Sequence, residues 1–194
     1  NIPMVIARTG WSGELSYELY LQDRKKGDEL FEIVHEAAKE FNGAVIAPNT
    51  IRTIEGGLLS YQSDFGREHN PFTIGLDRLV DLDQDIDFIG KEALRKIKSE
   101  GISEKLVGVE IDGDPIQKVP ENFWPVFDEN HKKIGRLSRC FFSPRLKKNI
   151  GLAIIDINFV EPGTPLVIES PKAHLNAQVH ELPWFPAEKS TNLD

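Results

Sequence analysis

Two side chains near the start of the chain, Glu18 and Tyr20, have the types and spacing of a small binding site. The run Leu15–Leu21 alternates with period two, so a strand would place Glu18 and Tyr20 side by side on one face. A carboxylate in that position can pair with two N–H groups of an amidine-like or pterin-like ring. Trp11 adds a surface on which a flat heterocycle can stack. The residues alone leave a simpler interpretation open, in which Glu18 faces solvent and Trp11 packs in a core.

An acidic segment further along the chain has most of the spacing of a calcium loop, with ligand candidates Asp81, Asp83, Asp85, Asp87 and Glu92. Its sixth position is Ile86, where such a loop needs glycine for its turn, so we interpret the segment as an acidic connection. The five histidines show no metal-ligand spacing. We therefore predict no metal site, and we name no catalytic residue.

Residues 130–155 contain basic residues and no acidic one, although the chain has a net charge of −8; the basic residues are Lys132, Lys133, Arg136, Arg139, Arg145, Lys147 and Lys148. Lysine and arginine at ordinary solvent-facing positions of strands would explain this excess of basic residues. An anion-facing patch is the second interpretation, and it predicts contact with an acidic carrier protein or a polyanionic ligand tail.

Length and composition exclude several classes of protein. The 194 residues are 40% hydrophobic and 28% charged, which is enough apolar material for the core of one domain or two small ones. The net charge of −8 argues against a general nucleic-acid binder. No apolar run approaches the ~20 residues that cross a bilayer, so we predict no membrane partner. The single cysteine, Cys140, fits a reducing compartment, and we expect a cytoplasmic protein, or a mitochondrial matrix protein in a eukaryote.

The first hundred residues combine strand and helix patterns. The predicted strands are Met4–Ala7, Leu15–Leu21, Ala44–Ala47 and Leu76–Leu82; the predicted helices are Asp28–Phe41, one that starts at Asn49 or Thr50, and Gly90–Ser99. An apolar stripe predicts that the first helix buries one face, and Gly43 is expected to supply its left-handed stop.

Beyond Gly101 the pattern changes to short β-like runs at regular spacing, which is typical of a sandwich or small barrel. These runs are Leu106–Ile111, Trp124–Phe127, Ile134–Leu137, Ile150–Ile157, Leu166–Glu169 and Leu175–Leu182. We therefore predict an α+β fold, with an α+β lobe (1–85), a linker with a short helix (86–104), an all-β barrel or sandwich (105–187) and a tail (188–194).

Short motifs follow one another along nearly the whole chain: R-T-G-W-S-G-E-L-S-Y-E at 8–18, R-T-I-E-G-G at 52–57, Tyr61 with Asp64, F-I-G-K-E-A-L at 88–94, L-V-G-V at 106–109, S-P-R-L-K-K-N-I-G at 143–151 and L-P-W at 182–184. In this order they resemble the signatures of the glycine cleavage T-protein family. That family includes aminomethyltransferases and tetrahydrofolate-dependent dimethylsulfoniopropionate demethylases. Trp11 and the string at 80–83 are more similar to the demethylase-like branch.

The resemblance implies a tetrahydrofolate pocket. At the matching positions, Glu18 would hold the pterin ring through paired hydrogen bonds, and Tyr20 and Trp11 would lie beside the folate. Two family arginines that contact folate fall on Asn49 and Thr53 here. The family's catalytic aspartate lies in a half of the fold that this sequence does not include. The chain would supply an incomplete folate-binding lobe and the whole β-rich last lobe of a three-lobed ring.

The sequence therefore predicts the C-terminal portion of a tetrahydrofolate-dependent one-carbon transferase, which moves a methyl or aminomethyl group from a sulfonium or amine donor to folate. The alternative is a non-catalytic folate-binding or regulatory module of the same fold. We expect this portion to be inactive alone. We also expect its apolar surface to be covered in a homo-oligomer or by the other half of the fold.

Overall fold

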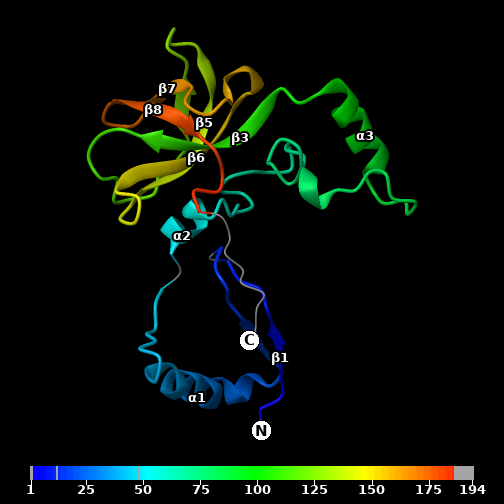
Figure 1. Cartoon of the computed structure of the whole chain (residues 1–194), viewed down its shortest axis with the longest axis vertical. Helices are drawn as coiled ribbons and strands as arrows, with labels where there is room; N and C mark the ends of the chain where they lie inside the picture. Colours follow the sequence, from blue (N-terminus) through cyan, green and yellow to red (C-terminus); the bar gives the residue numbers. More distant parts are fainter. Residues whose placement is uncertain (1, 12, 48, 186–194) are drawn as a thin grey trace.

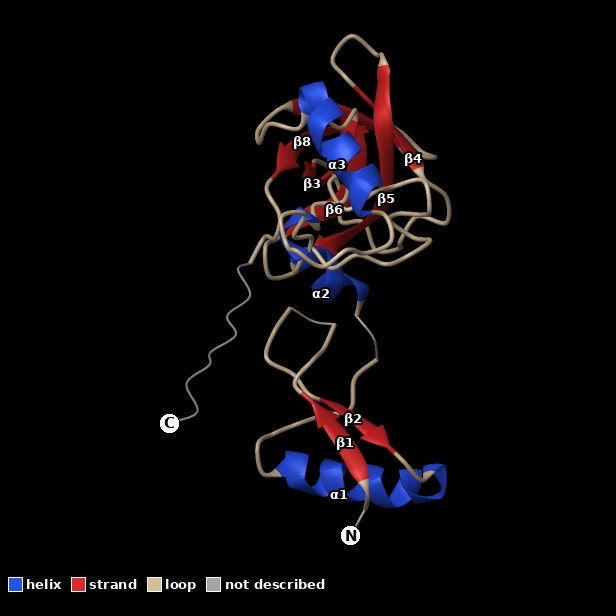
Figure 2. Ribbon diagram, turned by 90° about the vertical axis from the view of Figure 1, so that its right-hand side faces the viewer, coloured by secondary structure: helices blue, strands red, loops and turns tan. Residues whose placement is uncertain are grey.

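The computed structural model describes residues 2–11, 13–47 and 49–185, which form a β-barrel and a smaller α+β unit (Figure 1). The smaller unit starts with an antiparallel hairpin of β1 (Met4–Ala7) and β2 (Glu18–Leu21). After a single 3-10 turn at Arg24–Lys26, helix α1 (Gly27–Lys39) lies across the end of the hairpin that is farther from the barrel (Figure 2). A connection then leads toward the barrel.

The barrel is closed by six antiparallel strands in the order β3-β6-β5-β4-β7-β8. The strands are β3 (Glu104–Ile111), β4 (Trp124–Phe127), β5 (Lys133–Ser143), β6 (Lys148–Asp156), β7 (Pro165–Glu169) and β8 (His174–His180). A 3-10 turn, Ile157–Phe159, follows β6. Closure leaves no unpaired strand edge in the barrel, which is why this part of the chain can bury its backbone polar groups without a partner.

Apolar side chains that alternate along the six strands fill the barrel. Fully buried members from five different strands are Val109, Val126, Leu137, Ile155 and Ile168. Each strand contributes every second residue because side chains alternate between the two faces of a sheet. The predicted all-β domain is confirmed, and the overall fold is α+β with a barrel.

Helix α2 (Thr50–Glu55) packs on the outer surface of this barrel. Asn49 is its N-cap, and the Asn49 side chain accepts a hydrogen bond from the N–H of Ile51. Ile54 is fully buried against Ile150 and Leu152 of β6. Strand β6 is therefore buried on both faces, which explains the continuous apolar run in its sequence.

Helix α3 (Lys91–Glu100) connects the first part of the chain to β3, as predicted from its glycines. Gly90 precedes it with φ +93° and Gly101 ends it with φ +84°, and both conformations favour glycine. The preceding acidic segment is held by Lys91, whose ammonium donates to the carbonyl oxygens of Gln84 (2.5 Å) and Ile86 (3.1 Å). A cation of the chain itself thus contacts the segment that resembles a calcium loop.

Two predicted strands are wrong. Residues 44–47 form no strand, and Val45 is 67% exposed because no neighbouring strand lies beside it. The segment predicted as strand 76–82 instead forms a single 3-10 turn, Asp77–Leu79. Both apolar runs are too short to distinguish a strand from an apolar loop by periodicity alone.

The predicted burial of one face of α1 is also wrong, because α1 has no buried residue. Tyr17 and Leu19 are exposed as well. The C-terminal end of α1 also differs from the prediction. Asn42, rather than Gly43, takes the left-handed conformation, with φ +54°. The Gly43 N–H donates a hydrogen bond to the Ala38 carbonyl oxygen.

No helix in the described part of the chain is both long enough and apolar enough to cross a membrane. The predicted tail, 188–194, lies outside the described residues.

Candidate functional site

The hairpin brings Glu18 and Tyr20 together with Thr9. The register pairs Ala7 with Glu18, so Thr9, two residues beyond the end of β1, lies beside the carboxylate. The Thr9 hydroxyl donates a short hydrogen bond to Glu18 Oε2, and the Tyr20 hydroxyl donates to the same oxygen at 3.1 Å. Glu18 Oε1 accepts no hydrogen bond from any described residue. One edge of the carboxylate is therefore held in place, and the other is open.

The carboxylate of Glu18 changes the acidity of the neighbouring phenol. The hydrogen bond from Tyr20 to Glu18, and the negative charge that Glu18 carries, raise the pKa of Tyr20 above 10.0. Tyr20 is about half exposed, so the phenol can be titrated from solvent.

This coupling predicts a measurable change in tyrosine titration. Replacing Glu18 by glutamine removes the charge, so the pKa of Tyr20 is expected to fall back toward 10. Ultraviolet difference titration of the phenolate measures it, since the chain has only three tyrosines. Glu129→Gln, at an exposed position of the barrel, is the matched control, and an unchanged titration curve in Glu18→Gln would contradict the coupling.

Trp11, the third predicted site residue, is not brought into this cluster. It is 60% exposed, and none of Trp11, Glu18 and Tyr20 is among the described residues that line the nearby cleft. The contact of Glu18 with Tyr20 is present in the structure, whereas the role of Trp11 stays a prediction.

A cleft of about 790 Å³ lies between the hairpin loop and the barrel. Thr9 and Glu14 of that loop line one side, and Leu182 and Pro183, which follow β8, line another. Gly57, with φ +62°, lets the chain after α2 turn close to Leu182 and Pro183. Thr9 therefore belongs both to the carboxylate cluster and to the wall of the cleft.

Two arginines share one carboxylate beside this cleft. Glu14 lies in the hairpin loop, and its Oε1 accepts a short contact from Arg52 of α2 and a 3.5 Å contact from Arg145 of the β5–β6 turn. The Arg145 guanidinium also lies over the ring of Phe185, 3.6 Å from its centroid. This cluster links three separate elements around the mouth of the cleft.

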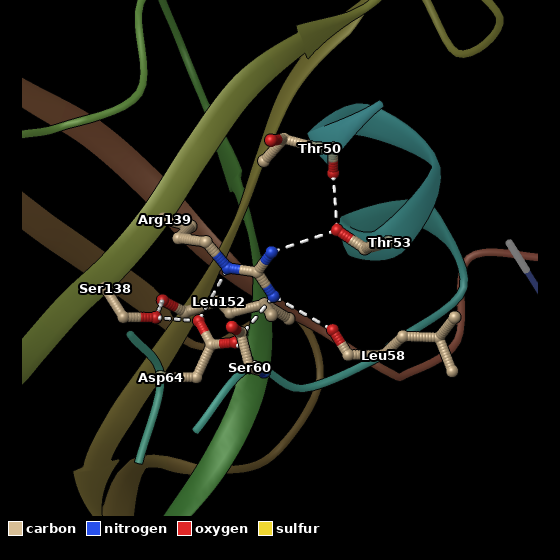
Figure 3. A network of polar contacts seen from close by, with 8 residues as sticks. All are labelled: Thr50, Thr53, Leu58, Ser60, Asp64, Ser138, Arg139 and Leu152. Atoms are coloured by element: carbon tan, nitrogen blue, oxygen red, sulfur yellow. Dashed lines mark hydrogen bonds and ion pairs between the residues drawn. The ribbon is translucent and has the colours of Figure 1, made fainter. Parts of the chain in front are cut away.

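A buried ion pair anchors α2 and the chain that follows it to strand β5 (Figure 3). Arg139 Nη2 and Asp64 Oδ2 are 2.5 Å apart, and Arg139 Nε donates to Asp64 Oδ1 at 2.8 Å. The guanidinium also donates to the Thr53 hydroxyl and to the Leu58 carbonyl oxygen, each at 2.9 Å. Asp64 accepts further hydrogen bonds from Ser138 and from the Ser60 N–H. One pair thus positions the segment that contributes Gly56–Leu59 to the cleft.

A second polar anchor lies at the end of α2. Glu55 is buried, and its carboxylate accepts a hydrogen bond from the Ser143 hydroxyl at 2.5 Å. The Glu55 carbonyl oxygen accepts from the N–H of Trp184 at 3.0 Å. Strand β5 and the chain after β8 therefore both contact this helix.

The basic window does not form a single patch. Four of its cations pair with carboxylates of the chain: Arg136 with Glu68, Arg139 with Asp64, Arg145 with Glu14 and Lys148 with Glu110. Lys133 is the first residue of β5 and Lys132 precedes it, whereas Lys147 follows the end of the strand, about 30 Å away at ~3.3 Å per residue. Contact of these cations with an acidic carrier protein or a polyanionic ligand tail stays a prediction.

Sequence reasoning missed Thr9 and the Asp64–Arg139 pair as parts of the site. Thr9 and Asp64 each belong to one of the family motifs, but the spacing of residues in those motifs does not indicate which side chains they bond to. Arg139 was read as part of the basic window because its acidic partner is 75 positions away. Among the described residues, no group of three or more histidine, cysteine or acidic side chains is placed to hold a metal ion.

Comparison with known proteins identifies the fold. A model of the GCVT N-terminal domain matches residues 1–84, and a model of the glycine cleavage T-protein C-terminal barrel domain matches residues 104–186. The chain belongs to the glycine cleavage T-protein family.

Relatives of two kinds match this T-protein family member over nearly its whole length. An aminomethyltransferase of Geobacillus sp. (strain WCH70) is 35% identical over 193 residues, which are 97% of this chain and 51% of the relative. The dimethylsulfoniopropionate demethylase DmdA of Ruegeria pomeroyi is 28% identical over 186 residues, 95% of this chain and 49% of the relative. The chain spans about half the length of the curated relatives that it matches. The assignment to the demethylase-like branch stays a prediction.

A solved structure has the same fold. The crystal structure of glycine cleavage system aminomethyltransferase T from Bartonella henselae superposes with a TM-score of 0.80 at 19% sequence identity. The match covers 94% of this chain and 50% of that chain. At this identity the likeness concerns the fold alone.

Proposed function

We propose that this chain provides the folate-holding carboxylate and the barrel of a tetrahydrofolate-dependent one-carbon transferase. Its donor would be an amine or a sulfonium, from which a methyl or aminomethyl group is transferred. The observation that carries the proposal is the Glu18 carboxylate, which is held through Oε2 by Thr9 and Tyr20. The family to which the chain belongs supports the choice of ligand.

The residues present fit a pterin-like ring. A pterin offers adjacent N–H donors on one edge, and a carboxylate with an accessible edge can accept two such bonds in parallel. Glu18 presents Oε1 without a described donor. Its orienting partner Thr9 also lines the cleft, which leads away from the cluster toward the barrel. When bound, tetrahydrofolate would supply the nitrogen that accepts the one-carbon unit.

The roles of the chain's own side chains follow from these contacts. Glu18 would bind and orient the ring, and the hydroxyls of Thr9 and Tyr20 would keep its carboxylate in one rotamer. The walls of the cleft would exclude water from the apolar part of the ligand. Thr53 occupies a position at which the family has a folate-contacting arginine. Arg52 is the residue before it, and its guanidinium pairs with Glu14 beside the cleft.

The proposal predicts that binding depends on the charge of Glu18. Glu18→Gln keeps the shape of the side chain, and it turns one acceptor of the ring's N–H pair into a donor. Tetrahydrofolate is expected to bind about 10- to 100-fold more weakly, since hydrogen bonds to charged groups contribute ~1.5–3 kcal/mol. Isothermal titration calorimetry on the full chain measures the dissociation constant.

Glu129→Gln is the matched control and is expected to bind like the unaltered chain. Circular dichroism of both variants checks that the fold is retained. Equal affinity for tetrahydrofolate in Glu18→Gln and in the unaltered chain would contradict the role of Glu18. Failure of the unaltered chain to bind tetrahydrofolate would contradict the proposal.

A further inference from the structure

The hairpin loop, defined here as residues 8–11 and 13–17, points toward helix α2 (Figure 2). Gly13 of this loop lies directly against Gly56, the residue that ends α2. A Cβ on Gly13 would lie 3.4 Å from the Gly56 Cα, and a Cβ on Gly56 would lie 3.5 Å from the Gly13 Cα. The two backbones can approach this closely because neither residue carries a side chain. This contact seats the loop on the end of α2.

An ionic cluster holds the next residue of the loop. The Glu14 carboxylate contacts the guanidinium of Arg52 in α2 and, at 3.5 Å, that of Arg145 in the β5–β6 turn. Arg145 is itself held by the ring of Phe185, 3.6 Å from its centroid. The three charged side chains are about half exposed, and ion pairs in such positions are weak and screened by salt. The cluster can therefore open and close reversibly.

A short path of contacts connects this end of the loop to the carboxylate cluster. The Ser16 hydroxyl lies 3.4 Å from the carbonyl oxygen of Glu14 and 3.2 Å from that of Thr9, so it can donate to either. A Cβ on Gly10 would lie 1.7 Å from the Ser16 Oγ, so the two sides of the loop are in direct contact there. The Thr9 hydroxyl in turn donates to Glu18 Oε2. Detachment of the loop is therefore expected to move Thr9 relative to Glu18.

We propose that Glu14 is a positioning residue for the carboxylate cluster, because it docks the hairpin loop on Arg52 and Arg145. The docked loop in turn holds the Thr9 hydroxyl on Glu18 and closes one wall of the cleft. When the loop detaches, Glu18 loses this donor and the wall moves away. The fraction of chains with a docked loop would then set the apparent affinity of the site, since only the docked form has the oriented carboxylate.

This inference rests on the proposed function only for its effect on ligand binding, and the phenol of Tyr20 reports on it without a ligand. The hydrogen bond to Glu18 and the charge of Glu18 raise the pKa of Tyr20, whereas the Thr9 hydroxyl lowers it. Loss of Thr9 from the cluster is therefore expected to raise the pKa of Tyr20 further. Removal of the Glu14 charge would by itself lower this pKa, since a nearby negative charge disfavours the phenolate. The sign of the change thus separates detachment of the loop from a simple charge effect.

The test is an ultraviolet difference titration of Tyr20 in the full chain. Tyr17 and Tyr61, which are both about half exposed, are replaced by phenylalanine so that Tyr20 is the only tyrosine. Glu14→Gln is expected to raise the pKa of Tyr20, as Thr9→Val does. In the Thr9→Val background, Glu14→Gln is expected to cause no further rise, because two changes that act through one contact are not additive.

Calorimetric titration of the same variants measures the consequence for the ligand. Loss of the two exposed ion pairs in Glu14→Gln is expected to weaken tetrahydrofolate binding about 2- to 20-fold. Glu129→Gln removes the same charge at an exposed position of the barrel, and it is expected to change neither the titration nor the affinity. If the unaltered chain does not bind tetrahydrofolate, the proposed function fails, whereas the Tyr20 titration still decides the role of Glu14.

Several results would overturn the role of Glu14. These are a pKa of Tyr20 that stays unchanged or falls in Glu14→Gln, an equal shift in Glu129→Gln, and a rise that persists in full in the Thr9→Val background. In a chain that binds tetrahydrofolate, equal affinity after Glu14→Gln would also overturn it. Glu14 and Thr9 are both exposed, so the chain should fold in each of these variants.

Discussion

Replacing Arg139 by methionine is expected to lower the free energy of unfolding by about 3–5 kcal/mol, because it leaves the Asp64 carboxylate buried without its cation. Asp64 is 0% exposed, and Arg139 occupies both of its oxygens. Methionine keeps much of the volume of the arginine stem, so the loss would come from the uncompensated charge rather than from a cavity.

The same substitution removes the bonds that hold α2 and the chain after it. Thr53 loses the donor to its hydroxyl, and the Leu58 carbonyl oxygen loses the donor at 2.9 Å. The segment 56–59, which lines the cleft, is therefore expected to become mobile. Faster hydrogen exchange at 53–64 would report this, whereas the barrel strands β3, β7 and β8 should remain protected until global unfolding.

Urea unfolding followed by tryptophan fluorescence measures the effect. Lys118→Met is the control, because Lys118 and its partner Glu121 are both largely exposed, and it should leave the unfolding midpoint unchanged. The double variant Asp64→Asn with Arg139→Met is expected to recover part of the loss, since no unpaired charge remains. An Arg139→Met midpoint equal to that of Lys118→Met would refute the structural role of the pair.

Replacing Gly135 by alanine is expected to destabilise the barrel by about 3 kcal/mol, at the upper end of the usual range for overpacking. A Cβ at this position would lie 2.2 Å from the Ile154 carbonyl oxygen and 2.7 Å from Ile155 Cα. Gly135 pairs with Val126 on one side and with Ile155 on the other, so β5 cannot move away from β6 without disturbing β4.

Thermal unfolding is the measurement, and a drop in melting temperature of roughly 6–12 °C is expected for a chain of this length. Gly27→Ala is the matched control. Gly27 has φ −60° and an added Cβ there would meet nothing within 4 Å. That substitution is expected to keep or slightly raise stability, because it restricts the unfolded chain. Equal melting temperatures for the two alanine variants would show that β5 and β6 separate freely at Gly135.

Local patterns in the sequence predicted the elements that depend on near neighbours. The alternation in residues 106–182 identified the barrel strands, since a strand with one face in a core must repeat every two residues. Gly90 and Gly101 bounded α3 for a similar local reason. Glu18 and Tyr20 were placed on one strand face, and the contact between their side chains agrees with that placement.

The position of Arg139 could not be predicted in this way. The alternation of β5 puts Leu137 and Arg139 on the same face, and Leu137 is in the core. The pairing with β6 shifts by one residue between Leu137 and Arg139, so Ser138 is an extra residue in the strand. This bulge turns Arg139 outward to Asp64 and returns Cys140 to the core.

The sequence by itself thus determined the barrel strands and the three helices, the α+β class with a barrel, and the placement of Glu18 beside Tyr20. Only the tertiary structure decided that Thr9 completes this cluster and that Asp64 meets Arg139. It also decided that the hairpin and α1 keep their apolar faces exposed. The physical reason is that periodicity reports which face of an element is apolar, whereas burial and ion pairing depend on what lies opposite that face, and the partners are distant in the sequence.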